Sequence, residues 1–242
     1  MADQVILSAR GLSKRFGAIT VIDDVSFDVN RGEVLGILGP NGAGKTTLFN
    51  LISGDLAANG GALSLDGAQL AAEPPYRRCK RGIGRTYQVP QPFGAMSAFE
   101  NLMVPAMLSA GLSETDAAAH CAQVLEDCGL SARANTDAGK LTLLDRKRLE
   151  LARALAGRPK LLLLDEIAGG LTDAEGAELV KLVRRVKATG VTIIWIEHVL
   201  HALMAVADRV MVLNFGEKIA MGTPQEVLQD PEVRRVYMGL EA

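Results

Sequence analysis

The sequence predicts an α/β fold with a mostly parallel core sheet, an antiparallel β subdomain and an inserted helical subdomain. Near both ends of the chain, short apolar runs alternate with amphipathic segments, which is typical of parallel strands covered by helices. Gly60-Gly61 and Asp66-Gly67 bracket a short alternating stretch, which indicates an antiparallel hairpin strand. Residues 97–128 are rich in Ala, Leu, Met and Glu with almost no β-branched run, which indicates helices.

These patterns predict eight strands and six helices. The expected strands are residues 5–8, 25–29, 34–38, 62–65, 160–164, 191–196, 210–214 and 218–221. The expected helices are residues 45–52, 98–109, 114–128, 145–156 and 174–188, and a capping box at Thr223 with Pro224 at the first helical position starts another. We therefore expect a single domain over 1–242. Its α/β core and antiparallel β subdomain take residues 1–88 and 141–242, and its helical subdomain takes about 89–140.

Composition limits the class of protein. The chain has 242 residues and a net charge of −2, which counts against a dedicated nucleic-acid binder. No run approaches the ~18 apolar residues of a membrane-spanning helix, and the first residues lack the basic-then-apolar design of a signal peptide, so we expect a soluble cytoplasmic chain. The three cysteines, Cys79, Cys121 and Cys128, lack metal-type spacing and are expected to be free thiols.

A glycine-rich turn between the strand at 34–38 and the helix at 45–52 matches the phosphate-binding pattern GxxxxGK[ST]. Its residues are Gly39, Pro40, Asn41, Gly42, Ala43, Gly44, Lys45 and Thr46. Glycines let successive backbone N–H groups converge on phosphate oxygens, and the following helix presents its positive end. Lys45 is expected to reach the β- and γ-phosphates, and the Thr46 hydroxyl to bind Mg²⁺.

Two carboxylates, Asp165 and Glu166, follow a run of four leucines. Such a run predicts a strand buried on both faces, and open α/β sheets bind ligands at the carboxyl ends of their strands. Asp165 is then placed to hold the Mg²⁺ shell, and Glu166 to orient or deprotonate the attacking water. Taken alone, the pattern also fits a strand that runs into a solvated turn, but the phosphate loop upstream favours the functional interpretation.

His198 follows a second apolar strand, at residues 191–196. A lone histidine after a strand is usually a surface or internally satisfied residue. Glu166 and His198 nevertheless end strands that could be neighbours, which would let the imidazole contact the γ-phosphate and the attacking water.

The order of these motifs resembles the ATP-binding subunit of ABC transporters over essentially the whole chain. The residues that carry the resemblance are the phosphate loop, Gln88 in Arg85-Thr86-Tyr87-Gln88, the segment 141–156, Asp165-Glu166 and His198. Within that family, the tail at residues 212–224, together with residues 230–233 and 237–239, resembles the branched-chain amino acid (LIV-type) uptake ATPases.

The resemblance implies an ATP hydrolase that uses ATP and Mg²⁺. The implied catalytic residues are Glu166, His198 and Lys45, and the implied metal-site residues are Thr46, Gln88 and Asp165. The implied nucleotide-binding residues are Phe16, the loop residues 39–46, Thr47, Gln88 and Thr142. Phe16 would stack on adenine, although it could also be a core aromatic at a strand end, and Gln88 would report the metal site to the helical subdomain.

The implied partners are a second ABC ATPase subunit, identical or different, and integral membrane permeases. A periplasmic or extracellular solute-binding protein would act indirectly, and no nucleic acid is expected. The chain would then attach peripherally to the inner face of the plasma membrane through the permease. Amino acids are the default cargo of the resemblance, while related systems carry urea, amides or aromatic acids.

The sequence departs from the family in the signature segment LSGGQ, which normally closes over the γ-phosphate bound by the other subunit. Here it is Leu141-Thr142-Leu143-Leu144-Asp145, so the hydroxyl remains while both glycines are leucines. Leucines hinder close backbone approach, and Asp145 adds negative charge near phosphate, so we expect a weaker or differently shaped site. Arg146, Lys147 and Arg148 could offset that charge.

Two other segments are candidate surfaces for contact with lipid or a partner protein. The basic residues Arg77, Arg78, Lys80, Arg81 and Arg85 are interpreted first as a solvated face around a turn, and otherwise as contacts to acidic lipid or a partner loop. The apolar stretch 89–96, with prolines 90, 92 and 105 nearby, is the better partner surface. The resemblance makes it the groove for the membrane subunit's cytoplasmic helix.

Three competing functions stay open. A related ATPase that exports lipopolysaccharide or other lipid shares much of this pattern. A soluble ABC-type ATPase acting on nucleic acid or the ribosome usually carries two ATPase units, coiled-coil insertions or basic tails, and this sequence shows none. A small-molecule kinase would fit the phosphate loop but not His198 together with the segment 141–156.

Overall fold

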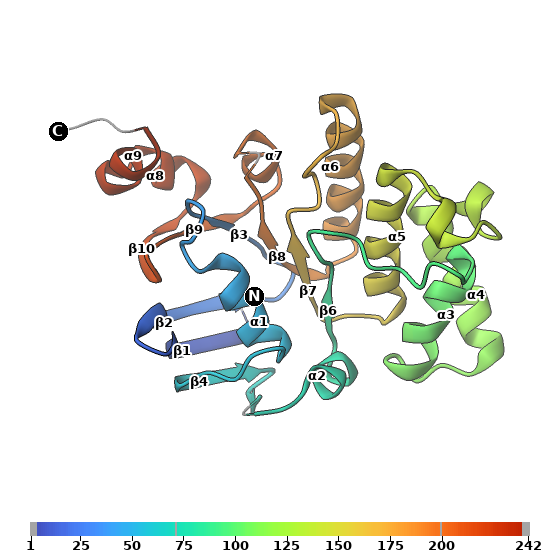
Figure 1. Cartoon of the computed structure of the whole chain (residues 1–242), viewed down its shortest axis with the longest axis horizontal. Coiled ribbons are helices and arrows are strands. Elements are labelled where there is room, and N and C mark those ends of the chain that lie inside the picture. The colour runs from blue at the N-terminus through green and yellow to red at the C-terminus, as the bar shows by residue number, and fades with distance from the viewer. Residues whose placement is uncertain (1–3, 71, 199, 239–242) are drawn as a thin grey trace. The chain divides into compact units, whose positions relative to one another are not determined.

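The computed structural model describes residues 4–70, 72–198 and 200–238 (Figure 1). These form two compact units: the first unit comprises the described residues up to Pro75 and from Thr192 onward, and the second unit comprises Tyr76–Val191. The expected division into an α/β core and a helical subdomain at about 89–140 remains a prediction.

The first unit contains an antiparallel sheet and a group of mainly parallel strands. The antiparallel sheet has the order β2-β1-β4-β5, formed by β1 (Val5–Phe16), β2 (Ile19–Asn30), β4 (Gly60–Leu65) and β5 (Ala68–Gln69). The strand β3 (Val34–Leu38) runs parallel to β8 (Thr192–Ile196) on one side and to β9 (Arg209–Asn214) on the other. β10 (Glu217–Gly222) pairs antiparallel with β9. The unit's helices are α1 (Lys45–Ser53), α7 (Leu200–Met204), α8 (Pro224–Gln229) and α9 (Pro231–Met238).

Burial explains why these strands are stable. Every residue of β3 and β8 is buried, as their continuous apolar sequences predict. Trp195 on β8 and Phe49 on α1 are fully buried. The capping box at Thr223 is confirmed, since its side chain accepts from the Glu226 N–H and Pro224 opens α8.

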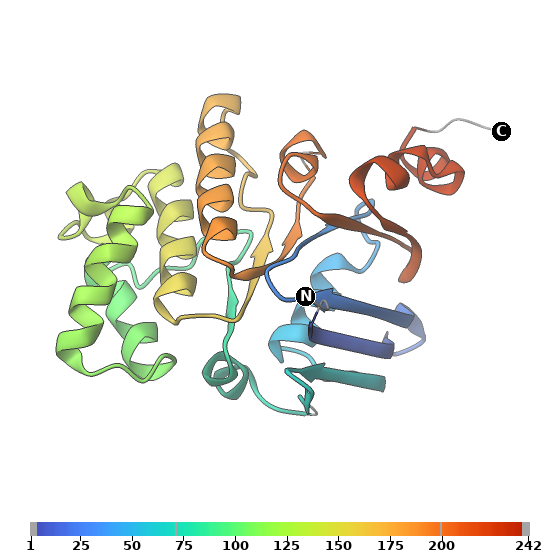
Figure 2. The ribbon, with the colours of Figure 1, turned by 180° about the vertical axis from the view of Figure 1, so that it is seen from behind.

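The second unit joins two parallel strands to a group of helices. The strands β6 (Ile83–Arg85) and β7 (Leu161–Asp165) pair in parallel. The helices are α2 (Pro75–Arg81), α3 (Ala98–Leu108), α4 (Glu114–Asp127), α5 (Leu143–Ala156) and α6 (Asp173–Ala188), with short 3₁₀ turns at Ser131–Arg133 and Ala138–Lys140. Figures 1 and 2 show α3, α4 and α5 side by side.

The expected elements are all present, with shifted ends. The sequence did not predict five short described elements, α2, β5, β6, α7 and α9, nor the two 3₁₀ turns. The solvated-turn interpretation of the basic cluster is wrong in part: α2 is a helix, its Arg78 is buried, and the Arg85 side chain is 8% exposed in an ion pair. Cys79, Cys121 and Cys128 are free thiols, as expected. None of the described helices is both long and apolar enough to span a membrane.

Candidate nucleotide-binding and hydrolysis site

The predicted site residues are divided between the two units. The first unit holds Phe16, the loop 39–46, Thr47 and His198, and the second holds Gln88, Thr142, Asp165 and Glu166.

The phosphate loop connects β3 to α1 with the geometry that its pattern requires. Gly44 has a φ of 101°, and a Cβ there would lie 2.6 Å from the Val21 carbonyl oxygen, so only glycine fits. Among the described residues no side chain caps the start of α1, and its first turn carries no acidic residue. A helix start of this kind suits an anion, as at other phosphate-binding helix ends.

Lys45 is drawn into this loop. Its side chain is buried, and Nζ donates hydrogen bonds to the carbonyl oxygens of Gly39 at 2.7 Å and Pro40 at 3.1 Å. The β9–β10 turn supports the loop from outside, since the Gly216 N–H donates to the Ala43 carbonyl at 3.1 Å. The ammonium is thus held at the loop, where phosphate oxygens would compete with two carbonyls for it.

His198 emerges at the same sheet edge as the phosphate loop. β3 and β8 are parallel neighbours with Ile37 opposite Ile196, and the loop and His198 follow their carboxyl ends. His198 is exposed, and its N–H donates to Oε2 of the buried Glu197 at 3.2 Å. Within this unit the structure therefore brings the phosphate loop and His198, both predicted to contact phosphate, to the same edge of the sheet.

Phe16, at the end of β1, is 47% exposed. Lys14 Nζ lies 5.1 Å from the centroid of its ring, a cation–π contact. The alternative of a buried core aromatic is wrong, because half of the side chain is available for stacking.

Asp165, the last residue of β7, is held from two sides in the second unit. Its side chain is almost fully buried, and Oδ2 lies 3.3 Å from Nη2 of Arg85 on β6. Its N–H donates to the Thr86 hydroxyl oxygen at 3.1 Å. The carboxylate is therefore fixed at the carboxyl end of the strand, as the sequence predicted.

Glu166 follows in a left-handed backbone conformation, with a φ of 46°. Such a conformation is uncommon outside glycine and points to a functional constraint. Gln88 Nε2 donates to the Glu166 carboxylate at 2.5 Å, which brings together two predicted site residues.

Lys147 on α5 ties the same two residues through their backbones. Its side chain is buried, and Nζ donates to the carbonyl oxygens of Gln88 at 2.6 Å and Glu166 at 3.1 Å. Our expectation that Lys147 offsets the Asp145 charge is therefore wrong. A signal existed in the sequence, because position 147 falls on the buried face of an amphipathic helix, where an unpaired lysine is costly.

The residue types fit the Mg²⁺ ion that accompanies ATP. Magnesium prefers hard oxygen ligands, which Thr46, Asp165 and Gln88 supply as hydroxyl, carboxylate and amide oxygens. Gln88 contacts Glu166 through Nε2, so its Oε1 is the atom that would face a cation.

The substituted signature segment begins α5. Thr142 is the N-cap, and its hydroxyl oxygen accepts from the Asp145 N–H at 3.2 Å, while Leu143 is 45% exposed. The Asp145 carboxylate lies 3.7 Å from Arg148 Nη1 and 3.8 Å from Arg133 Nε. The charge is thus offset by Arg148, as expected, and also by Arg133, which the sequence did not indicate.

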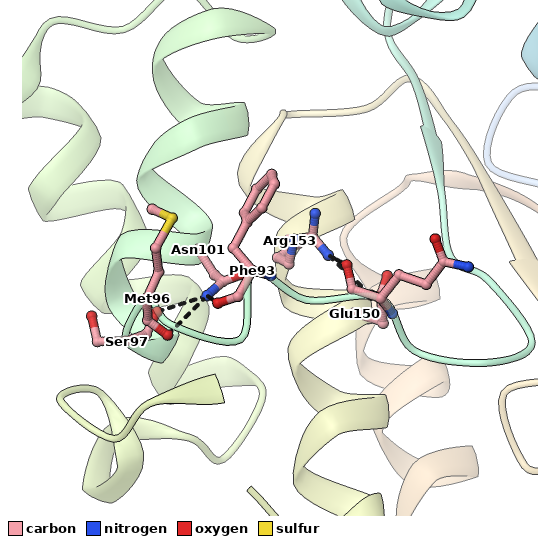
Figure 3. A network of polar contacts seen from close by, with 7 residues as sticks. Phe93, Met96, Ser97, Asn101, Glu150 and Arg153 are labelled. Atoms are coloured by element: carbon pink, nitrogen blue, oxygen red, sulfur yellow. Dashed lines mark hydrogen bonds and ion pairs between the residues drawn. The ribbon is translucent and has the colours of Figure 1, made fainter. Parts of the chain in front are cut away.

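A groove of about 480 Å³ lies in the second unit beside the predicted partner surface. Its lining includes Tyr76, Tyr87, Phe93, Pro105, Leu108 and Arg153. Buried Asn101 fixes the loop that forms one wall, since its Nδ2 donates to the carbonyls of Phe93, Met96 and Ser97 (Figure 3).

The other wall belongs to α5. Arg153 lies over the Phe93 ring, 5.0 Å from its centroid, and forms an ion pair with Glu150 at 3.0 Å (Figure 3). Both residues also hold Gln91: its N–H donates to Glu150 at 2.6 Å, and its carbonyl accepts from Arg153 at 2.9 Å. Burial raises the pKa of Glu150 above its usual value, although Arg153 opposes that rise.

The chain is similar to known families, proteins and solved structures. The model of the ABC transporter family matches residues 22–169, and that of the branched-chain amino acid ATP-binding cassette transporter family matches residues 217–242. The chain is 36% identical to the branched-chain amino acid transport ATP-binding protein BraF of Pseudomonas aeruginosa, covering 97% of this chain and 98% of the relative. It is also 36% identical to LivG of Salmonella typhimurium, with 98% of each covered. Its identity to the lipopolysaccharide export ATP-binding protein LptB of Escherichia coli is 34%, over 96% of this chain and 97% of the relative.

Solved structures agree with these sequence relationships. A nucleotide-free ATP-binding cassette of an ABC transporter superposes with a TM-score of 0.88 at 31% identity, covering 98% of this chain and all of that one. A cassette in its ADP conformation gives the same TM-score at 32% identity, with the same coverage. The chain therefore belongs to the ATP-binding subunits of the ABC transporter family, and it is an ATP hydrolase.

Proposed function

We propose that the chain hydrolyses MgATP to drive import of branched-chain or related amino acids through separate membrane permeases. The observation that supports amino acids as the cargo is the near full-length similarity to BraF and LivG. The family model of branched-chain amino acid ATP-binding cassette transporters, which matches residues 217–242, supports the same cargo. The observation that supports hydrolysis is the strained Glu166, whose carboxylate and carbonyl are held by Gln88 and Lys147.

Each proposed residue has a distinct task in the chemical step. Glu166 takes a proton from water as the water oxygen bonds to the γ-phosphorus, and the bond to the β–γ bridging oxygen breaks to release ADP. Lys45 and the first turn of α1 stabilise the phosphate charge, and His198 orients the γ-phosphate and the water. Phe16 stacks on the adenine. Thr46, Asp165 and Gln88 would hold Mg²⁺, which when bound would supply positive charge to the phosphates.

Two ATPase subunits would complete two composite sites, in which Thr142 of one subunit faces the nucleotide of the other. Here Thr142 already caps its own helix, Leu143 is exposed beside it, and Asp145 stands in its first turn. The bulk of Leu143 at this helix start, where the family has glycine, disfavours close approach of a phosphate to the backbone. We infer that the site completed by this chain's signature segment is the weaker one, which suits pairing with a second, different ATPase.

The groove beside Phe93 is the proposed docking site for the permease's cytoplasmic helix. It offers aromatic and aliphatic walls with the ion pair Arg153–Glu150, so it suits an amphipathic helix. Docking there would hold the chain at the inner face of the plasma membrane. A solute-binding protein on the other side would deliver the cargo, and no nucleic acid takes part.

Uptake of radiolabelled leucine by cells that lack this chain tests the proposal. We expect uptake to fall, to recover with the wild-type chain, and not to recover with Glu166→Gln expressed at the same level. A control substitution at Lys181, an exposed residue paired with Glu178, should restore uptake fully.

The similarity to LptB supports a second candidate, lipopolysaccharide export. In that case, deletion would leave leucine uptake intact and deplete lipopolysaccharide at the cell surface. That outcome would overturn the proposed cargo.

A further inference from the structure

A second cavity, of about 420 Å³, lies in the second unit, away from the groove beside Phe93. It is enclosed by the end of α4, the segment that follows α5, and the last turns of α6. Pro159 in its wall precedes β7, whereas Asp165 is the last residue of that strand. The cavity therefore lies at the opposite end of β7 from the carboxylates of the hydrolysis site.

The floor of this cavity is apolar. It is formed by Val124, Leu155, Leu182 and Val186, of which Val124, Leu182 and Val186 are buried. Cys128 adds a neutral thiol, because burial raises its pKa to about 12. Such a floor suits an aliphatic group, and the volume lies within the range of small-molecule sites.

The rim carries charges of both signs. Arg158 and Arg185 supply two guanidinium groups, and Asp127 supplies one carboxylate. Arg185 Nη2 also donates to the Asp127 backbone carbonyl at 3.1 Å, which fixes α6 against the end of α4. The Asp127 carboxylate accepts from Gln123 at 3.0 Å, and a carboxylate can accept several further hydrogen bonds.

His120 in the same wall responds to charges of both signs. Burial and the Arg158 charge lower the pKa of His120, while the Asp127 charge opposes that change. One imidazole thus senses a guanidinium and a carboxylate at once, and its Nε2 is buried without a hydrogen-bond partner among the described residues.

Arg158 is also held in a demanding backbone conformation. Arg158 follows Gly157, the C-cap of α5. The φ of Arg158 is 50°, a value that arginine seldom adopts. Its N–H donates to the Leu155 carbonyl at 2.9 Å, so the turn itself is well formed. Arg158 thus lines the cavity from a turn whose backbone is fixed.

From this complementarity we propose that the cavity binds a free α-amino acid with an aliphatic side chain. Arg158 and Arg185 bind the carboxylate, Asp127 binds the ammonium, and the apolar floor receives the side chain. This ligand is of the same class as the proposed cargo, so a regulatory meaning rests on the proposed function, whereas the binding itself does not. Cytoplasmic amino acid would then reach the ATPase at a site separate from ATP.

Isothermal titration calorimetry of the full chain tests the proposal with four probes. Leucine carries all three recognised groups, 4-methylpentanoate lacks the ammonium, leucinamide lacks the carboxylate, and glycine lacks the side chain. We expect saturable leucine binding and at least tenfold weaker binding of each of the other three. Absence of saturable leucine binding, or binding of 4-methylpentanoate or leucinamide as tight as that of leucine, would overturn the proposal.

Variants locate the ligand. Arg158→Asn removes the guanidinium but keeps a residue that tolerates positive φ, and Asp127→Asn removes the carboxylate. Each should weaken leucine binding at least tenfold, and Asp127→Asn should leave 4-methylpentanoate binding within twofold. Lys181→Gln, which removes a charge from α6 outside the cavity, is the matched control and should leave leucine binding unchanged. If all three variants bind leucine equally, the ligand lies elsewhere.

Two further measurements separate binding from folding and from the cargo. The thermal midpoint and ATP affinity of each variant should match the wild type, so that a lost leucine signal reports the cavity. Leucine uptake by cells remains the test of the cargo. Uptake without leucine binding to the chain would refute this site alone, and binding without uptake would refute the cargo alone.

Discussion

Replacement of Lys147 by Met should slow ATP hydrolysis at least ~10-fold. The same substitution should lower the free energy of unfolding by only about 1–3 kcal/mol. The substitution keeps the length and the apolar stem of the side chain but removes the ammonium that bonds the carbonyls of Gln88 and Glu166. These two carbonyls belong to Gln88, whose amide is proposed to bind the metal, and to Glu166, whose carboxylate is proposed to activate the water. We therefore expect Lys147 to be a positioning residue that acts through Gln88 and Glu166.

The expected loss of stability follows from opposing contributions. Each hydrogen bond to a charged group contributes roughly 1.5–3 kcal/mol, so the two bonds together amount to about 3–6 kcal/mol. Burying the ammonium, which is 3% exposed, itself costs several kcal/mol, and Met avoids that cost. We therefore expect the free energy of unfolding to fall by about 1–3 kcal/mol.

The rate of ATP hydrolysis should respond strongly to the same substitution. Without their common anchor, the backbones of Gln88 and Glu166 can shift, and a displacement of ~1 Å at a catalytic group costs on the order of 10²-fold in rate. Steady-state phosphate release at saturating ATP should therefore fall at least ~10-fold. ATP affinity should change little, because the phosphate loop lies in the first unit.

The assay compares turnover, ATP affinity and unfolding of Lys147→Met with those of Lys181→Met. Lys181 is exposed and pairs with Glu178 at 2.8 Å, so its loss should cost less than about 1 kcal/mol and leave turnover unchanged. If Lys147→Met loses stability but hydrolyses ATP at the wild-type rate, the bridge is structural only and the positioning role is refuted.

Three further outcomes are expected. Glu166→Gln should retain MgATP binding while steady-state hydrolysis falls at least ~10²-fold, the scale of general-base assistance, and unchanged turnover would remove Glu166 from that role. The double substitution Leu143→Gly and Leu144→Gly should change the ATPase rate of the assembled transporter but not the nucleotide affinity of the isolated chain; altered affinity in the isolated chain would contradict action on the partner's nucleotide. Because burial lowers the pKa of His120 below its unfolded value, the unfolded state binds more protons between those two pKa values. Stability should therefore fall as pH drops below about 6.5, and thermal midpoints of His120→Gln should lack that component.

The elements that sequence predicted well are those whose stability is local. The turn at Gly44 needs a left-handed residue beside the Val21 carbonyl, and the capping box at Thr223 is written within four residues. Buried strands such as β7 and β8 show as continuous apolar runs. Each of these signals is contained in a short window, so no knowledge of distant contacts was required.

The features that sequence missed depend on partners far along the chain. Arg85 appeared to belong to a solvated basic cluster, but its guanidinium pairs with Asp165, eighty residues later. Lys147 appeared to balance a neighbouring charge, but its acceptors are carbonyls at positions 88 and 166. Only the pairing of β6 with β7 and the packing of α5 create these contacts, and a three-residue strand such as β6 leaves almost no periodic signal.

The placement of these contacts on α5 explains how the groove and the hydrolysis residues can influence each other. Lys147 holds Gln88 and Glu166, and Glu150 and Arg153, three and six residues further on, hold Gln91 and Phe93 in the groove wall. Residues three apart on a helix are neighbours on its surface, so one rigid helix carries both sets of contacts. The segment from Gln88 to Phe93 is thus fixed to α5 at both of its ends. A permease helix that moves Phe93 must either move α5 together with Lys147 or break the Arg153 contacts. Each alternative changes the contacts that hold Glu166.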